Sequence, residues 1–114
     1  GTIYNARQVV DKIGHLCDYI LFDSAWVGYE QFIPMMRDCS PLLLELGPED
    51  PGIFVTQSVH KQQAGFSQSS QIHKKDAHIR GQDRFIPHKV LNNAAAPHNI
   101  SFRLSHLTNE CRTS

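Results

Sequence analysis

The chain has 114 residues, of which 40% are hydrophobic and 19% charged, and its formal net charge at pH 7 is zero. This size and composition are typical of one soluble domain or of part of a larger one. No apolar stretch approaches the ~20 residues that a transmembrane helix needs. We therefore expect a cytoplasmic protein without a membrane partner.

The charges are distributed unevenly along the chain. Residues 11–50 carry eight acids against two bases, a net −6, whereas residues 60–90 carry six bases against two acids, a net +4. A basic stretch can bind phosphate or nucleic acid, although it is more often a solvated surface. A polyanion-binding surface at residues 60–90 is therefore kept as an alternative function, ranked last, and nucleic acid is not expected as the partner.

The cysteines and histidines do not form a recognisable metal pattern. Cys17, Cys39 and Cys111 are widely spaced and form no CxxC, so we expect free thiols in a reducing compartment. His73 and His78 are five positions apart, which matches neither a helical ligand pair nor another known ligand spacing. We predict that these two histidines are surface residues and that the chain holds no metal.

The first predicted element is an amphipathic helix that begins after Asn5. Apolar side chains recur there at helical spacing: Ala6, Val9, Val10, Ile13, Leu16 and Cys17. Asn5 is placed to cap the helix, and Gln8, three residues later, completes a pattern similar to a capping box.

Two short apolar runs predict buried strands. The first is YILF at 19–22, and the second contains Ile53, Phe54 and Val55. Between them, residues 26–36 predict one or two irregular helical turns that Pro34 ends. The two runs are about 30 residues apart, which favours a crossover unit with two parallel strands.

The rest of the chain gives weaker signals. The small, polar residues 64–72 are compatible with a strand that returns along the sheet, and residues 73–93 read as a surface segment. Residues 95–114 show no clear period. The predicted class is α/β, with a mainly parallel sheet and flanking helices.

A carboxylate and an amine follow the two predicted strands. Asp23 ends the first strand, and Lys61 lies just past the end of the second. Ligands of open α/β sheets bind beyond the carboxyl ends of the strands, so parallel strands would place both residues at one crevice. A buried lysine reacts with the aldehyde of pyridoxal phosphate (PLP), and a carboxylate keeps the ring nitrogen of PLP protonated. The pair fits a PLP site, with a solvated lysine and a turn or cap aspartate as the alternatives.

Two motifs carry a family resemblance. FDSAWVGYE at 22–30 and SVHKQQAGFSQ at 58–68, in that order, resemble the bacterial Orn/Lys/Arg decarboxylases, which are PLP enzymes of the aspartate-aminotransferase-like fold. The chain is most similar to the ornithine-specific members. The resemblance covers residues 1–94 and implies a segment of the PLP-binding large domain. It also implies that Lys61 is the Schiff-base lysine and that Asp23 pairs with the pyridine nitrogen.

Further site residues and the activity follow from the same resemblance. Three residues match family positions that contact the cofactor or its phosphate: Ser58, His60 and Trp26. The implied reaction is decarboxylation of a basic amino acid, with ornithine converted to putrescine in the parent enzyme, or lysine or arginine decarboxylated instead.

The chain also departs from the family pattern. The ring-stacking histidine and the phosphate-cradling loop of the family lie upstream of the match, and residues 95–114 read as a foreign, irregular tail. We therefore expect an excised central segment that is inactive by itself and that does not necessarily bind PLP. The alternative is a non-catalytic, engineered or excised folding unit that self-assembles into a homo-oligomer through open sheet edges.

Overall fold

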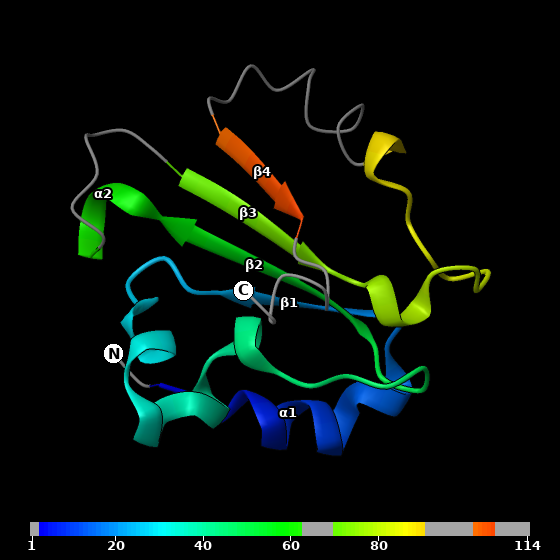
Figure 1. The fold of residues 1–114 in the computed structure, drawn as a ribbon, viewed down its shortest axis with the longest axis horizontal. Helices are drawn as coiled ribbons and strands as arrows, with labels where there is room; N and C mark the ends of the chain where they lie inside the picture. The colour runs from blue at the N-terminus through cyan, green and yellow to red at the C-terminus, as the bar shows by residue number, and fades with distance from the viewer. Residues whose placement is uncertain (1–2, 63–69, 91–101, 107–114) are drawn as a thin grey trace.

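The computed structural model describes residues 3–62, 70–90 and 102–106 of the chain. These residues build a four-stranded sheet with helical segments around it (Figure 1). The strands are β1 (Tyr19–Asp23), β2 (Gly52–Ser58), β3 (Ser70–Lys75) and β4 (Phe102–His106), and the α-helices are α1 (Ala6–Ile13) and α2 (Val59–Gln62). Short 3-10 helices occupy Gly14–Leu16, Tyr29–Phe32, Pro34–Cys39, Pro41–Leu43 and Ala77–Ile79.

The sheet has the order β1-β2-β3-β4 and is mixed. β1 pairs with β2 in parallel, β2 with β3 antiparallel, and β3 with β4 in parallel. The expected α/β class and the parallel β1–β2 pair are thus confirmed. Two of the three pairings are parallel, but the sheet is mixed, so the mainly parallel sheet that was predicted is not confirmed. The connection from β2 to β3 is shorter than a crossover requires, and β3 therefore returns antiparallel.

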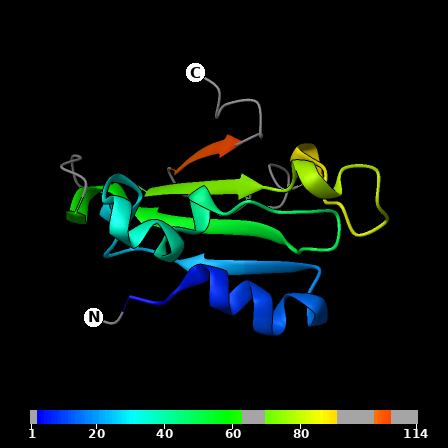
Figure 2. The same cartoon turned by 60° about the horizontal axis from the view of Figure 1, so that its bottom comes forward.

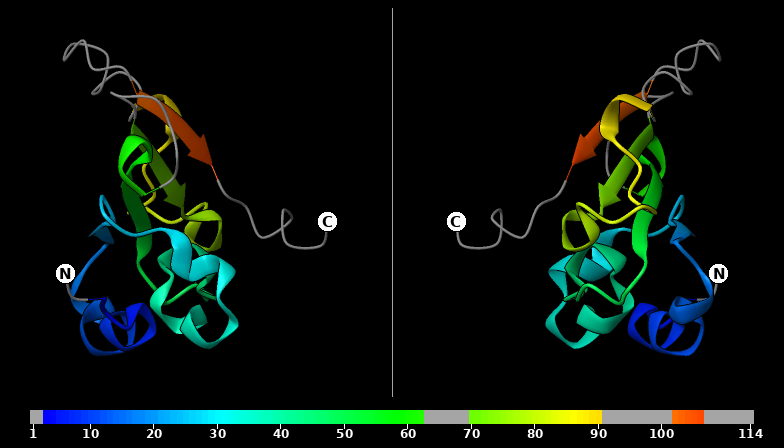
Figure 3. Two further views of the ribbon diagram at one scale, coloured as in Figure 1. Left: turned by 90° about the vertical axis from the view of Figure 1, so that its left-hand side faces the viewer. Right: turned by 90° about the vertical axis from the view of Figure 1, so that its right-hand side faces the viewer.

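Two segments differ in extent from the sequence prediction. The returning strand begins at Ser70 and continues to Lys75, and residues 64–69 lie outside the described residues. Part of the tail that was expected to be irregular, Phe102–His106, forms β4 at the sheet edge. Figure 3 shows from both sides that β4 and α1 lie at opposite ends of the molecule.

One face of the sheet carries the main apolar core. Asn5 caps α1 as predicted, because its side chain accepts a hydrogen bond of 3.0 Å from the backbone N–H of Gln8. The helix lies beside β1 (Figure 2) and contributes to a cluster of buried side chains: Ala6, Val10, Leu44, Ile53 and Val55. Ile13 and Leu16 are exposed, so the buried stripe of α1 is shorter than the sequence periodicity predicted.

The other face is closed by a buried polar network. The ring of Tyr19 stacks on Phe54 with centroids 5.1 Å apart, and its hydroxyl donates a hydrogen bond of 2.8 Å to Asp76. The same hydroxyl accepts a hydrogen bond of 2.8 Å from the backbone N–H of Ile86. Lys74 pairs with Asp76 at 2.6 Å and donates to the carbonyl of Ile86. The network joins the segment after β3 to β1.

Residues 73–93 were predicted to form a surface segment, and this prediction is wrong for the buried residues among them, which include Lys74, Lys75, Asp76 and Ile79. Lys74 and Asp76 are buried as an ion pair, and Lys75 is buried while donating to the carbonyls of Leu42 and Leu44. His73 is half-buried with its Nε2 2.9 Å from Oε1 of Gln57, and burial lowers the pKa of this imidazole. Each of these polar groups finds a partner far away in the sequence, which local polarity does not reveal.

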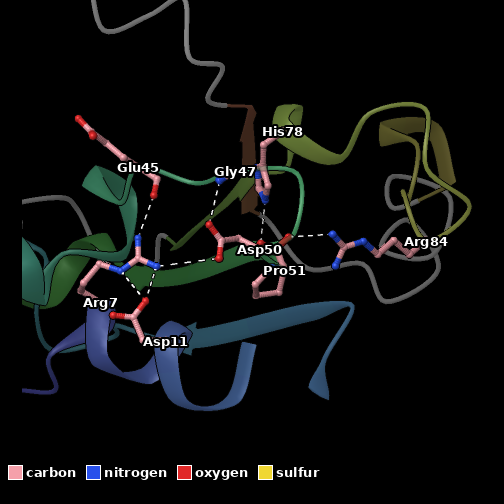
Figure 4. A network of polar contacts seen from close by, with 8 residues as sticks. All are labelled: Arg7, Asp11, Glu45, Gly47, Asp50, Pro51, His78 and Arg84. Carbon is pink, nitrogen blue, oxygen red and sulfur yellow. Dashed lines mark hydrogen bonds and ion pairs between the residues drawn. The ribbon is translucent and has the colours of Figure 1, made fainter. Parts of the chain in front are cut away.

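A second set of contacts fixes the segment that leads into β2 (Figure 4). Arg7 of α1 forms an ion pair of 2.7 Å with Asp11 and donates a hydrogen bond of 2.9 Å to the carbonyl of Glu45. On the opposite side, Arg84 donates to the carbonyl of Asp50 at 3.0 Å, and Nε2 of His78 donates to that of Pro51 at 2.9 Å. His78 is thus a structural contact and not the surface residue that was predicted.

Within residues 3–62, 70–90 and 102–106, no helix is both long and apolar enough to cross a bilayer.

Candidate functional site

The predicted site residues lie where β1 and β2 end. Asp23, the last residue of β1, is the register partner of Thr56 in the parallel strand β2. Two residues after Thr56, β2 ends at Ser58, and α2 follows directly with His60 and Lys61. Asp23 and Lys61 therefore lie at the same edge of the sheet, where β1, β2 and α2 come together (Figure 1).

The carboxylate of Asp23 is oriented by its neighbours. Its Oδ1 accepts a hydrogen bond of 3.1 Å from the backbone N–H of Ala25 and a longer one of 3.4 Å from Oγ1 of Thr56. The first contact is local, whereas the second exists because β2 is parallel to β1 and places Thr56 opposite Asp23. Asp23 remains exposed to solvent, so it is available to a ligand.

Trp26 connects the loop after β1 with the helix after β2. The Nζ of Lys61 lies 4.6 Å from the centroid of the Trp26 ring, a distance typical of a cation–π contact. Both side chains are exposed, and 63% of the Trp26 surface is accessible. A lysine amine becomes reactive when burial disfavours its charged form, and Lys61 is exposed in this chain.

The other two predicted cofactor contacts are adjacent to Lys61. Ser58 ends β2 and His60 lies in α2, and both are partly buried. The second motif continues to residue 68, but its part at 63–68 lies outside the described residues.

A groove of about 950 Å³ runs along β1, the edge strand of the sheet. Its walls come from α1, from β1 and from the loop after β1, and two of the predicted site residues, Asp23 and Trp26, are among them. The lining is rich in apolar side chains, including Leu21 and Tyr29. Asp23 and Trp26 thus border a groove that the sequence did not predict, whereas Ser58, His60 and Lys61 are not among its lining residues.

Sequence reasoning also missed two residues that shape the site. Thr56 contacts Asp23 through a strand register that the sequence does not reveal. Glu30 was counted as one of many acids, yet it is buried, and its Oε2 accepts a hydrogen bond of 2.7 Å from the backbone N–H of Gly28. Glu30 follows Gly28 within the first motif, and this proximity is the one signal that could have drawn attention to it.

Comparison with known proteins identifies the family. The model of the Orn/Lys/Arg decarboxylase major domain matches residues 1–104. The chain therefore belongs to the Orn/Lys/Arg decarboxylase family, as its two motifs predicted. The match extends past residue 94, and the boundary between the family segment and a foreign tail stays a prediction.

The individual relatives include ornithine, arginine and lysine decarboxylases. The chain is 83% identical to the inducible ornithine decarboxylase of Escherichia coli over 98 residues, and these aligned residues make up 86% of this chain and 13% of that protein. It is 84% identical over 98 residues to the ornithine decarboxylase of Haemophilus influenzae, covering 86% of this chain and 14% of the relative. The biodegradative arginine decarboxylase of E. coli is 36% identical over 77 residues, which cover 67% of this chain and 10% of that protein. The chain thus spans about one seventh of the length of its ornithine decarboxylase relatives.

Proposed function

We propose that this chain is a segment of a PLP-dependent decarboxylase of a basic amino acid, with ornithine as the substrate of the parent enzyme. In this proposal Lys61 is the Schiff-base lysine and Asp23 is the partner of the pyridine nitrogen. The main support is that the parallel β1–β2 pair brings this carboxylate and this amine to one sheet edge. The high identity to ornithine decarboxylases favours ornithine over lysine or arginine.

The side chains at this edge fit the functional groups of PLP. Lys61 offers an amine for the aldehyde, and the exposed carboxylate of Asp23 would hold a proton on the ring nitrogen through a charge-assisted hydrogen bond, worth about 1.5–3 kcal/mol. Ser58 and His60 offer a hydroxyl and a ring N–H to the phosphate. When bound, PLP supplies the electron sink for cleavage of the bond to the α-carboxylate.

The contact between Trp26 and Lys61 sets a condition for the reaction. A cation–π contact at an exposed site is worth about 0.5–1 kcal/mol, and here it holds the side chain of Lys61 against the ring of Trp26. Lys61 must lose a proton and leave this contact before its nitrogen can attack an aldehyde. The exposed position of Lys61 also leaves the amine hydrated. We therefore expect the isolated chain to bind PLP weakly and not to decarboxylate ornithine.

The polyanion-binding alternative has less support. It relied on six basic side chains in residues 60–90, of which Lys74 and Lys75 are buried in contacts with the protein itself. Fewer cations are therefore left on the surface for a phosphate-rich partner.

The proposal is tested by trapping PLP on the chain. After incubation with PLP, borohydride reduction fixes the cofactor to the lysine that has reacted, and peptide mass spectrometry identifies that lysine. We expect PLP to label Lys61 in the wild type. This labelling should be absent in Lys61→Ala and weaker in Asp23→Asn. Lys12→Ala, which removes an exposed lysine of α1, is the matched control and should leave the labelling unchanged. Equal labelling of the wild type and Lys61→Ala would contradict the assignment.

A further inference from the structure

Glu30 is a buried acid next to the proposed site. It is 2% exposed and lies in the 3-10 helix Tyr29–Phe32, four residues after Trp26. Its carboxylate accepts a hydrogen bond of 2.7 Å from the backbone N–H of Gly28. A buried carboxylate is unfavourable unless hydrogen bonds compensate for its lost hydration, so an apolar side chain would be the simpler choice for packing alone.

The residue that Glu30 holds, Gly28, has an unusual backbone conformation. Its φ of 138° is one that residues with a side chain rarely adopt. The carbonyl of Gly28 accepts a second hydrogen bond, of 2.9 Å, from Nε2 of Gln31. Gly28 is therefore fixed through both its N–H and its carbonyl, and both contacts come from the 3-10 helix that follows it.

The loop between Asp23 and Gly28 is anchored at its other end as well. The N–H of Ser24 donates a hydrogen bond of 2.8 Å to the carbonyl of Thr56 in β2, and the N–H of Val27 donates one of 3.2 Å to the carbonyl of Ser24. Trp26 lies between these two anchors. The backbone of this loop sets the position of the Trp26 Cα and so brings the largely exposed ring within reach of Lys61.

We propose that Glu30 is a positioning residue of the site. Its carboxylate fixes Gly28, and the fixed loop then presents Trp26 to Lys61 beside Asp23. The relevance of Glu30 to catalysis rests on the proposed function, in which Lys61 is the reactive lysine. The positioning itself is a property of this chain and can be measured without PLP.

Trp26 provides a specific readout because it is the single tryptophan of the chain. Trp26 fluorescence is recorded with and without the substitution Lys61→Met. The change in the Trp26 emission, and in the quenching of that emission by acrylamide, measures the contact between the two side chains. We expect this effect in the wild type and in Glu30→Gln, whose amide oxygen still accepts the hydrogen bond of Gly28. In Glu30→Ala, which has no acceptor, Lys61→Met should leave the emission unchanged. Glu45→Ala is the control, because the side chain of Glu45 is 81% exposed and the effect should persist there.

Two results would overturn the positioning role. The first is that the Glu30→Ala protein folds, with the circular dichroism of the wild type, and that Lys61→Met changes its Trp26 emission as much as it does in the wild type. If Glu30→Ala does not fold, hydrogen exchange of the Gly28 amide in Glu30→Gln decides. The charge-assisted bond should make this amide exchange about 5–10-fold more slowly in the wild type than in the variant, and equal rates would refute the proposal.

The outcome is separable from that of the PLP test. If Lys61 is not labelled by PLP but the emission effect depends on Glu30, the proposed function fails and the positioning stands. If Lys61 is labelled and the emission effect does not depend on Glu30, the reverse holds.

Discussion

Gly52, the first residue of β2, lies under the ring of Tyr19. A Cβ at this position would be 2.3 Å from Cε1, 2.5 Å from Cδ1 and 2.9 Å from Cζ of that ring. The ring cannot move aside freely, because it stacks on Phe54 and its hydroxyl is held by Asp76 and by the N–H of Ile86. Gly52→Ala therefore forces either the ring out of the network or β1 away from β2.

The expected loss of stability follows from these contacts. Overpacking alone costs about 1–3 kcal/mol. Displacing the Tyr19 hydroxyl adds about 1 kcal/mol for the neutral hydrogen bond to Ile86 and about 1.5–3 kcal/mol for the one to the charged Asp76. Together these contributions predict that Gly52→Ala lowers the free energy of unfolding by about 3.5–7 kcal/mol, a large fraction of the 5–15 kcal/mol typical of small domains.

Urea unfolding followed by circular dichroism measures this loss, and Gly47→Ala is the matched control. At Gly47 the nearest atom to a new Cβ is Oδ2 of Asp50 at 3.9 Å, an ordinary contact. That substitution should be neutral or stabilise the protein by up to about 1 kcal/mol, because alanine restricts the unfolded chain. A difference below about 1 kcal/mol between the two variants would refute the reasoning.

Two further predictions concern the polar contacts. Burial raises the pKa of Tyr19 to about 12, the hydrogen bond to Asp76 acts in the same direction, and the N–H of Ile86 opposes it. Because an unfolded tyrosine ionises near pH 10, the stability that Tyr19 contributes should be complete below about pH 10 and lost as the pH rises toward 12. An ultraviolet titration follows the ionisation of the tyrosines, and a titration in which all of them ionise together near pH 10 would contradict this prediction. Arg7→Ala should destabilise the protein by about 1–2 kcal/mol, because Asp11 and the carbonyl of Glu45 lose a charged donor. Arg7→Lys should recover less than half of this loss, since lysine lacks the planar guanidinium fork of arginine. Urea unfolding measures both variants, with Lys12→Ala as the neutral control, and an Arg7→Ala protein as stable as the wild type would contradict the prediction.

The elements that sequence predicted well are those fixed by local signals. Asn5 and Gln8 predicted the start of α1, because capping uses groups three residues apart. The spacing between the two apolar runs predicted the parallel β1–β2 pair, because a long connection permits it. From that pair, the positions of Asp23 and Lys61 at one sheet edge followed directly.

The parts that sequence did not predict depend on distant partners. HKKD at 73–76 reads as a solvated segment, yet Lys74 and Asp76 are buried as an ion pair, with Tyr19 donating to Asp76 and the carbonyl of Ile86 accepting from Lys74. Nothing near Lys74 in the sequence announces these groups.

Pro34 has two roles, of which the sequence predicted one. The 3-10 helix Tyr29–Phe32 ends just before Pro34, as predicted, and Pro34 also stands at the first position of the next 3-10 helix, Pro34–Cys39, where its missing N–H is not needed. The backbone between β1 and β2 therefore continues as short 3-10 helices that return beneath the sheet.

In the proposed function, the alignment and the burial of Lys61 are separate requirements, and the chain meets them unequally. The β1–β2 register and the anchored loop align Asp23, Trp26 and Lys61 without help from outside. Burial is different, because Lys61 and Trp26 are exposed and the groove beside Asp23 is open along the edge strand. A hydrated ammonium is a poor nucleophile, so in our proposal the rest of the parent enzyme contributes by covering this edge and excluding water. Because the chain aligns Asp23 and Lys61 but does not exclude water from them, we expect PLP to label Lys61 while ornithine is not decarboxylated.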